Sequence, residues 1–577
     1  MRLPSKRAFR KEADAVMAGE GYPDFKSEAI KQRLRVTHAE LQAQYLSNNM
    51  WPHVFAGKDY YSSVGYYRDT NPYFGDQMKL GAFQRFDPRW LEIDPIGDID
   101  KAQDIWRETP WKVRAEYLYS LAHALMSDTW TWRFVSALMH DTGKSAPEAW
   151  GEYNEVYRFV LIHVWFMYKR YGMTDAFSSC KLAGDYYGAS SRGKGIGLVI
   201  APFNFPAAIP IRMLTLMLAS GCVGILKGAT TASLVTKLIY DVCEEVRLET
   251  GIGPEGLVNF APGSGGIAAD AFLSDPRIRI FSFTGSSEVC EGIQRKHHFS
   301  DRIGGNQLLT GSAETGGVNW IVMGDYKNMP YVANQCIRAN FGISGQKCST
   351  LRVLFTREHD TEEMLGLLVA EYDKLTYGDV LQGADLGPVI DMNAKNEIDR
   401  KIAMLESEGI ARVVYRKRID PSPSGQDVAP TILLATGALQ DPEKMKVLLD
   451  TEIFGPVFTV VPYRNLDDVK KLTKVAKYGL TGAVFERDPV LLAKVQMWLP
   501  AGNSYGNRRC TGATAPEAFG GLGGSQSSYN SGLKGYDEMP LYVDNRTHST
   551  VYESDWTEKE KRLFVQTMEE HTVTIKK

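Results

Sequence analysis

The 577-residue sequence lacks the features that mark several large classes of protein. No apolar stretch reaches the roughly 18 to 20 residues of a membrane-spanning helix, and the basic N-terminus is not followed by the apolar segment of a secretory signal. The formal net charge of −3 gives no reason to expect a nucleic acid or an anionic membrane surface as partner. We therefore expect a cytoplasmic protein without nucleic-acid or membrane partners.

Cysteine patterns of the kind that hold metals or disulfide frameworks are also missing. The seven cysteines are an odd number, are scattered along the chain, and form no CxxC pair or alternation with histidine. We expect no metal site, and a reducing compartment fits best. No GxGxxG pattern follows a predicted strand and opens a helix, which is the context of a dinucleotide-binding turn, so any nucleotide site must be recognised by other signals.

The chain is too long for one hydrophobic core, so two or three domains are expected. Residues 1–110 are rich in Tyr, Phe, Asp and Pro without a clear period, which predicts an irregular N-terminal arm that packs on the body of the protein. Residues 111–171 carry apolar residues at three- and four-residue spacing, as in Ala115–Met126, and are predicted to form amphipathic helices.

Short continuous apolar runs alternate with helical patterns from residue 196 onward. The runs 196–200, 223–226, 257–260 and 278–283 are separated by helix-like segments, which is typical of buried parallel strands in a βαβ layout. A second block begins at 318–323 and continues with helix 328–341, strand 352–356, helix 361–375 and further units as far as Phe485. The sequence thus predicts an α/β fold with a dinucleotide-binding domain and a second α/β domain.

The C-terminal region has strand character at residues 540–552, followed by a charged helix from Ser554. A single strand with no core of its own to join is expected to pair with another subunit. We therefore expect a homodimer or a higher homo-oligomer.

Three polar residues that are far apart in the sequence each lie among small or aromatic neighbours. Cys348 follows Gly345-Gln-Lys, Glu314 precedes Thr-Gly-Gly, and Asn204 is framed by Pro-Phe and Phe-Pro. Together they provide a nucleophile, a base and an oxyanion donor, the set needed for covalent oxidation of an aldehyde. Most cysteines are inert core residues, but the adjacent Lys347 is unusual for a core position.

Two further features suggest a nucleotide site. Phe283-Thr284-Gly285-Ser286 closes a predicted strand and opens a helix, where free amides can face a pyrophosphate, although a turn without function fits the pattern equally well. Lys227 ends the strand 223–226, at the edge where open α/β sheets bind ligands, and can donate to ribose hydroxyls. The alternative interpretation of Lys227 is a solvated surface lysine without a role in binding.

The order of these segments resembles the aldehyde dehydrogenase superfamily over residues 195–545. The matching segments are Pro202–Pro206, Leu226-Lys227, Phe283–Ser286, Glu314–Gly317, Gly345–Cys348, Leu386–Pro388, Glu452–Pro456 and Phe519–Gly521. Within the superfamily the chain is most similar to the Δ1-pyrroline-5-carboxylate (glutamate-γ-semialdehyde) dehydrogenases, on segments that include Ala313–Gly317, Gly345–Val353, Tyr478–Gly482 and Asn507–Ala513.

The resemblance implies a role for each matched residue. The catalytic residues would be Cys348, Glu314 and Asn204. The cofactor NAD would be held by Phe203, Lys227, Thr230, Thr284, Gly285, Ser286, Glu452 and Phe454. The aldehyde substrate would be bound by Ser349, Gly512, Ala513 and Phe519, and its carboxylate by the Gly512-Ala513 loop. The implied activity is oxidation of L-glutamate γ-semialdehyde to L-glutamate in proline catabolism, through a cysteine thiohemiacetal and thioester.

The resemblance also implies the domain plan. A Rossmann-type NAD(P)-binding domain would span 111–313 and carry an oligomerisation hairpin at about 183–197. The catalytic domain would span 314–530, and an oligomerisation strand and tail helix, completing a β flap, would span 531–577.

One departure and two alternatives remain. Lys227 is followed by Gly-Ala-Thr230, so the carboxylate that would repel a 2′-phosphate is missing, and NADP stays possible beside NAD. Arg508-Arg509 could serve other anions, which leaves open another carboxylated or aromatic semialdehyde as substrate. A catalytically inactive binding or structural protein on a dehydrogenase scaffold is the alternative of another class.

Overall fold

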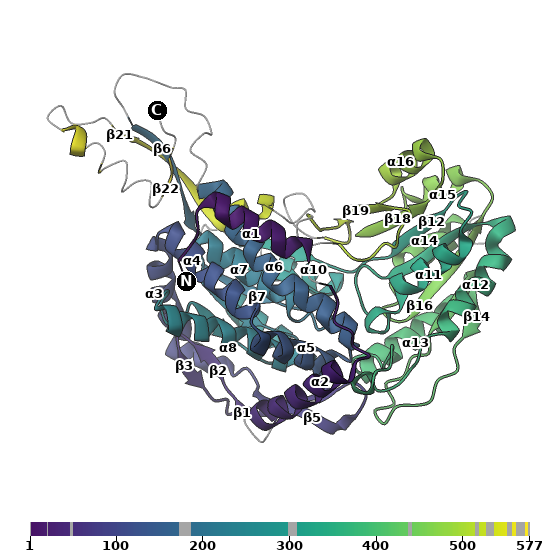
Figure 1. Cartoon of the computed structure of the whole chain (residues 1–577), viewed down its shortest axis with the longest axis horizontal. Helices are drawn as coiled ribbons and strands as arrows, with labels where there is room; N and C mark the ends of the chain where they lie inside the picture. Colours follow the sequence, from purple (N-terminus) through teal and green to yellow (C-terminus); the bar gives the residue numbers. More distant parts are fainter. Residues whose placement is uncertain are drawn as a thin grey trace.

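The protein has two lobes, and a small sheet projects from the larger one (Figure 1). The computed structural model describes residues 2–19, 21–46, 50–171, 186–297, 309–436, 441–513, 518–526, 536–550, 557–560, 563 and 572–574. Within these ranges each lobe contains one seven-stranded sheet. No helix in the described part of the chain has the length and apolar character needed to span a membrane.

The sheet of the larger lobe confirms the predicted parallel βαβ layout. Its strand order is β11-β10-β7-β8-β9-β2-β3, and the first five strands pair in parallel. Most of their residues are buried because helices cover the sheet, which explains why the strands read as continuous apolar runs. These five strands are β7 (Ile196–Ile200), β8 (Gly224–Lys227), β9 (Val258–Phe260), β10 (Ile278–Thr284) and β11 (Thr310–Glu314).

The helices of this lobe follow the predicted periodicity. Residues 111–171 form three helices, as expected, and one of the helix-like segments that follow forms the helix Ser233–Thr250. Three helices end at left-handed glycines, Gly143, Gly221 and Gly251, which accept a positive φ without steric cost. The helices are α4 (Trp111–Leu125), α5 (Asp128–Thr142), α6 (Ala146–Tyr171), α7 (Ala208–Ser220), α8 (Ser233–Thr250), α9 (Gly265–Ser274) and α10 (Ser287–His297).

The prediction of an irregular arm over residues 1–110 is wrong for its described part. Strands β2 and β3 extend the large sheet, β2 pairing antiparallel with β9 at Val54 and Phe260. Phe9 and Phe55 are buried in the core of the same lobe, so the segment does pack on the body. Its elements are α1 (Lys6–Ala18), α2 (Glu28–Leu41), α3 (Pro95–Glu108), β1 (Met50–Trp51), β2 (His53–Phe55), β3 (Lys58–Tyr60), β4 (Tyr66–Asn71) and β5 (Gly75–Gln84).

The smaller lobe is the second α/β block, with strand order β14-β15-β16-β13-β12-β18-β19. All neighbouring pairs are parallel except β14 with β15. The strands are β12 (Asn319–Met323), β13 (Leu351–Arg357), β14 (Ala411–Arg416), β15 (Thr431–Ala435), β16 (Val457–Tyr463), β18 (Thr481–Phe485) and β19 (Asn503–Gly506). The helices are α11 (Met329–Asn340), α12 (Thr361–Asp373), α13 (Met392–Ser407), α14 (Pro442–Asp450), α15 (Leu466–Leu472) and α16 (Pro489–Trp498).

The projecting sheet has the antiparallel order β21-β6-β22. Its strands are β21 (Val543–Thr550), β6 (Tyr186–Gly193) and β22 (Thr572–Thr574). Strand β21 lies within the predicted strand 540–552. Residues 183–185 of the predicted hairpin lie outside the described residues, as does most of the helix predicted from Ser554.

The connection between the lobes determines where a site can form. Glu314 closes β11 of the first sheet, and β12 of the second sheet begins five residues later at Asn319. The carboxyl ends of the first sheet's strands therefore face the amino ends of the second sheet's strands. Loops from both edges meet there, at the edge where open α/β sheets bind ligands.

Candidate active site

Cys348 lies on the loop between α11 and β13, and buried side chains fix its backbone. Asn319 donates from Nδ2 to the main-chain oxygens of Cys348, at 2.6 Å, and Thr350, at 2.8 Å. The Asn319 Oδ1 atom accepts the N–H of Thr481 at 3.0 Å, so this buried amide is paired at both ends. The position of Cys348 therefore depends on the first residue of β12.

Arg352 fixes the same loop from the other side. Its guanidinium is buried and donates to the main-chain oxygens of Gly345, at 2.8 Å, and Gly455, at 2.7 Å. Burial lowers the pKa of Arg352 to about 10. One side chain thus ties the loop before Cys348 to the loop that contains Phe454.

The approach to Cys348 is held in an unusual backbone conformation. Ile343, Ser344 and Gly345 have φ values of 45°, 51° and 73°, and the first two are non-glycine residues in the left-handed region. Glu148 of α6 accepts the N–H of Ile343 and forms an ion pair with Lys347 at 3.0 Å. Contacts from the larger lobe therefore hold a strained turn in the smaller one.

The Cys348 thiol is protonated at neutral pH. Of the six cysteines in the described ranges, Cys348 alone is not fully buried. Partial burial, together with the nearby carboxylates of Glu314 and Glu452, raises the pKa of Cys348 to about 12, although the backbone N–H groups of Ser349 and Cys348 oppose the shift. The thiol therefore needs a base to take its proton before it can react as a thiolate.

Glu314 and Glu452 approach the sulfur from different loops. Glu314 is 8% exposed at the end of β11, where it pairs in register with Thr284 of β10. Glu452 accepts the N–H of Gly317 at 2.8 Å, and burial raises the pKa of this carboxyl group. A side chain at Gly316 would collide with the Glu452 carboxylate, which explains why a glycine follows Glu314-Thr315.

Asn204 lies on the loop between β7 and α7, against residues that flank Cys348. The Lys347 ammonium lies 5.7 Å from the ring centroid of Phe205, the residue after Asn204. On the other side of Asn204, the ring of Phe203 contacts that of Phe454 edge to face, with centroids 6.1 Å apart. Asn204 is 4% exposed, and no hydrogen-bond partner for its Oδ1 atom exists among the described residues. The structure therefore brings the Asn204 loop, Glu314 and Cys348 to the same place.

A buried ion pair holds the Asn204 loop. Lys144 donates to Glu152 and, at 2.6 Å, to the main-chain oxygen of Asn204. Glu152 also accepts the N–H groups of Ala207, at 2.9 Å, and Ala208, at 3.1 Å. The sequence analysis missed this pair because both residues read as ordinary polar positions of a helical region.

Most of the residues predicted to hold the cofactor lie at the carboxyl edge of the larger sheet, whereas Glu452 and Phe454 come from the smaller lobe. Lys227 is 5% exposed, its ammonium group donates to the oxygen of Gly228 at 2.7 Å, and burial lowers its pKa to about 8. The solvated-surface alternative for Lys227 is therefore wrong. Thr230 begins the short turn that leads into α8, three residues beyond Lys227.

The Thr284–Ser286 turn leads from β10 into α10. A side chain at Gly285 would lie 2.6 Å from the ring of Phe283, so only glycine fits without movement. Ser286 accepts the N–H of Val289 at 3.4 Å and so caps the first turn of α10. A buried ammonium group, a helix N-terminus and a glycine-lined turn at one sheet edge fit the ribose and pyrophosphate of a nicotinamide dinucleotide.

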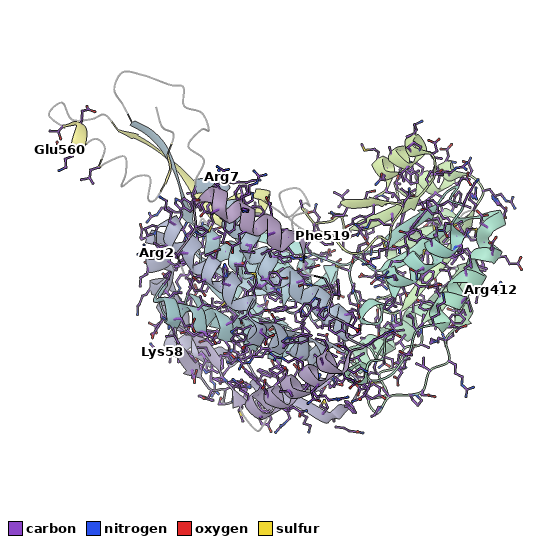
Figure 2. The ribbon with its side chains drawn as sticks, in the orientation of Figure 1. Arg2, Arg7, Lys58, Arg412, Phe519 and Glu560 are labelled. Atoms are coloured by element: carbon purple, nitrogen blue, oxygen red, sulfur yellow. The ribbon has the colours of Figure 1, made fainter. Side chains whose placement is uncertain are left out.

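The predicted substrate residues lie on a loop that contacts the Cys348 segment. The Sγ atom of Cys510 lies 3.6 Å from the main-chain oxygen of Ser349, which follows Cys348. Gly512 has a φ of 84°, and the Arg508 guanidinium donates to its oxygen at 2.7 Å. Ala513 is the last described residue before 518, and Figure 2 places Phe519 between the two lobes.

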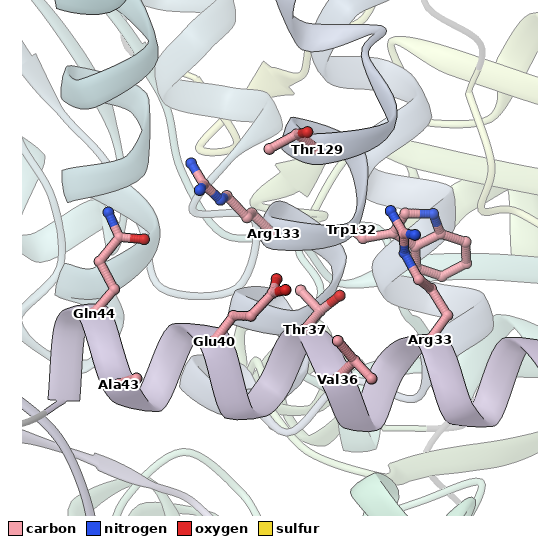
Figure 3. Close-up of a pocket in the computed structure, with 9 residues that line it drawn as sticks. All are labelled: Arg33, Val36, Thr37, Glu40, Ala43, Gln44, Thr129, Trp132 and Arg133. Carbon is pink, nitrogen blue, oxygen red and sulfur yellow. The ribbon is translucent and has the colours of Figure 1, made fainter.

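A surface pocket of about 590 Å³ lies elsewhere, between α2 and α5 (Figure 3). None of its lining residues belongs to the loops around Cys348, so we assign it no part in the reaction. They are Arg33, Val36, Thr37, Glu40, Ala43, Gln44, Thr129, Trp132 and Arg133. The described residues also contain no cluster of three or more His, Cys, Asp or Glu side chains that could hold a metal ion.

Comparisons with known proteins agree with this geometry. The model of the aldehyde dehydrogenase family matches residues 69–542 and so begins well before residue 195, where the resemblance in the sequence motifs starts. The chain is 31% identical over 456 residues to a 1-pyrroline-5-carboxylate dehydrogenase of Bacillus cytotoxicus, covering 78% of this chain and 84% of the relative. A Bacillus cereus protein of the same name is also 31% identical, over 454 residues.

Solved structures share the fold. The 1-pyrroline-5-carboxylate dehydrogenase from Thermus, determined with bound NAD, has a TM-score of 0.82 at 24% identity and covers 92% of this chain and 98% of its own. Proline utilization A from Bdellovibrio bacteriovorus has the same TM-score and identity over 93% of this chain and 54% of its own. From the family match and the Bacillus relatives, we conclude that this chain belongs to the aldehyde dehydrogenase family and is an oxidoreductase.

Proposed function

We propose that the protein oxidises L-glutamate γ-semialdehyde, the open form of 1-pyrroline-5-carboxylate, to L-glutamate with NAD. The observation that supports this proposal most directly is the approach of three loops to Cys348. One carries Asn204, one carries Glu314, and the third runs through Gly512. The named activity of the Bacillus relatives supports the choice of substrate.

The chain's own residues account for each stage of the reaction. The Cys348 sulfur adds to the aldehyde carbon, and because the thiol is protonated at rest, Glu314 takes its proton. The amide of Asn204 and the backbone N–H of Cys348 stabilise the oxyanion of the thiohemiacetal, each donor contributing about 3 to 4 kcal/mol in comparable sites. After Glu314 has released that proton to solvent, its carboxylate activates the water that releases the acid from the thioester.

The cofactor is held mainly by the larger lobe, and Glu452 and Phe454 of the smaller lobe complete its site. Phe203, Lys227, Thr230, Thr284, Gly285, Ser286, Glu452 and Phe454 would contact it, and when bound it supplies the hydride acceptor. NADP stays an alternative to NAD, because no carboxylate stands at Thr230 to repel a 2′-phosphate.

A kinetic assay of three variants tests the proposal. The wild-type protein with NAD and 1-pyrroline-5-carboxylate should form reduced cofactor continuously, and Cys348→Ser should form none. Glu314→Gln should release no more than about one equivalent of reduced cofactor per active site and then stall, since the variant lacks the base for the thiol proton and does not hydrolyse the thioester. Cys243→Ser, at a buried cysteine of α8, is the matched control. Steady turnover by Cys348→Ser would contradict the proposal.

We also propose that the protein is a homo-oligomer, with the β21-β6-β22 sheet as its contact. The sheet projects from the body of the lobe, and β21 and β22 are both edge strands (Figure 1). Exposed edge strands are ready to pair with another chain. Light scattering on a variant that ends at residue 542 should show a smaller species than the full chain.

A cytoplasmic location stays a prediction.

A further inference from the structure

Three arginines gather beside the loop that carries Gly512. Arg508 and Arg509 belong to the loop, and Arg338 lies in the last turn of α11. Burial lowers the pKa of Arg509, and the positive charges of Arg338 and Arg508 lower it further. Across the described ranges, none of the three forms an ion pair with a carboxylate. The region therefore holds like charges together, and no carboxylate among the described residues pairs with them.

Arg508 shapes the loop itself. Its guanidinium lies 4.7 Å from the centre of the Tyr505 ring and donates to the main-chain oxygens of Thr511, at 3.1 Å, and Gly512, at 2.7 Å. Both carbonyl groups are thereby satisfied. The backbone N–H groups of residues 511–513 make no hydrogen bond within the part of the chain that the structure describes. Successive free N–H groups in a tight turn form a site for an anion.

Arg509 is placed differently. Its backbone N–H donates to the side-chain oxygen of Gln335 at 3.2 Å, which fixes the residue. Its guanidinium has no hydrogen-bond acceptor among the described residues, and its Nη2 and Nε atoms lie 3.4 and 3.6 Å from the point that a Cβ atom at Gly512 would occupy. The two donors of one guanidinium edge therefore lie beside the loop amides. An edge of this kind binds a carboxylate through two parallel hydrogen bonds.

This anion site lies next to the reacting residue. Cys510, between Arg509 and Thr511, contacts the oxygen of Ser349 at 3.6 Å, and Ser349 follows Cys348. Thr481 contacts the same oxygen at 3.4 Å. A short molecule with an aldehyde at one end and a carboxylate at the other could therefore reach both Cys348 and the loop.

We propose that Arg509 is a specificity-determining residue that binds the carboxylate of the aldehyde substrate, the group remote from the reacting carbon. This inference rests on the proposed function and extends it from the loop backbone to a named side chain. The positive charge of Arg509 favours anionic aldehydes over neutral ones of similar length, whereas backbone amides alone discriminate less.

Two substitutions at Arg509 and two aldehydes test the inference. Arg509→Met keeps the apolar stem and removes the charge, and Arg509→Lys keeps the charge without the two-donor edge. The control is Arg412→Met, at an exposed arginine of β14 in the other part of the lobe (Figure 2). Each protein is assayed with 1-pyrroline-5-carboxylate and with butanal, and each melting temperature is recorded.

Arg509→Met should raise KM for the anionic substrate about 10- to 100-fold, with kcat and the constants for butanal within about twofold of wild type. The KM of Arg509→Lys for the anionic substrate should lie between those of wild type and Arg509→Met. Arg412→Met should match wild type. An unchanged KM for the anionic substrate, or equal losses with both aldehydes, would overturn the inference.

The proposed substrate and the role of Arg509 can be tested separately. If the wild-type enzyme does not oxidise 1-pyrroline-5-carboxylate, the same variants are compared on succinate semialdehyde and butanal. A loss by Arg509→Met that is confined to succinate semialdehyde would still support the role of Arg509. Equal losses with both would overturn it.

Discussion

Lys144 donates a 2.6 Å hydrogen bond to the main-chain oxygen of Asn204 and forms an ion pair with the buried carboxylate of Glu152. Because Glu152 also accepts two N–H groups at the start of α7, the pair fixes both ends of the Asn204 turn. Lys144→Met should reduce kcat about tenfold or more, since a small displacement of an oxyanion donor is costly. It should also destabilise the fold by about 3 to 5 kcal/mol, because Glu152 is left without its cation.

The double variant Lys144→Met with Glu152→Gln separates the two effects. Neutralising both partners removes the unpaired charge and keeps an acceptor for the α7 amides, so most of the stability should return. The kcat should stay low, because the bond to Asn204 is still missing. Urea unfolding and steady-state kinetics measure the two quantities, and wild-type kcat in the double variant would show that Lys144 does not position Asn204.

The reactivity of Cys348 should rise with pH over an unusually wide range. A pKa near 12 means that the thiolate fraction increases about tenfold for each pH unit below that value. The rate of alkylation by iodoacetamide, followed at Cys348 by mass spectrometry, should therefore climb from pH 7 to pH 10 without reaching a plateau. Glu314→Gln should react faster than wild type at each pH, because it removes a negative charge that raises the pKa. A plateau below pH 9 would contradict the protonated resting state.

The choice between NAD and NADP should depend on Thr230. Thr230→Glu places a carboxylate in the short turn that connects Lys227 to α8. A negative charge there repels a 2′-phosphate, so KM for NADP should rise about tenfold or more while KM for NAD changes little. Thr129→Glu, at an exposed position of α5, adds the same charge away from the predicted cofactor residues and should change neither constant. Equal effects on both cofactors would contradict the prediction.

The sequence predicted what depends on local pattern. Continuous apolar runs located β7 and β10 within one or two residues, because strands buried on both faces need apolar side chains at every position. The short strands β2 and β3 were missed, since they have three residues each and join the sheet through the pairing of β2 with β9, about 200 positions away. No local period encodes such a contact.

The candidate site, like the fold, has a part that local sequence patterns predict and a part that they do not. Cys348, Glu314 and Asn204 could be recognised from their neighbours, whereas the residues that hold their loops could not. Arg352 could have been recognised from the sequence, because a charged residue inside the apolar run Leu351–Phe355 indicates a buried partner. Asn319 gave none, since an asparagine at the start of a strand is ordinary.

Asn319 offers the sharpest test of how the loop around Cys348 is held. Asn319→Ala removes both donors and leaves the oxygens of Cys348 and Thr350 unpaired, which should cost about 2 to 4 kcal/mol of stability. Asn319→Asp keeps the shape of the side chain but turns an oxygen toward those two carbonyl groups. Repulsion should then displace the Cys348 segment, so kcat should fall at least as far as in Asn319→Ala, by about tenfold or more. Urea unfolding and single-turnover kinetics separate the two effects. Wild-type kcat in the aspartate variant would mean that the Asn319 bond does not position the nucleophile.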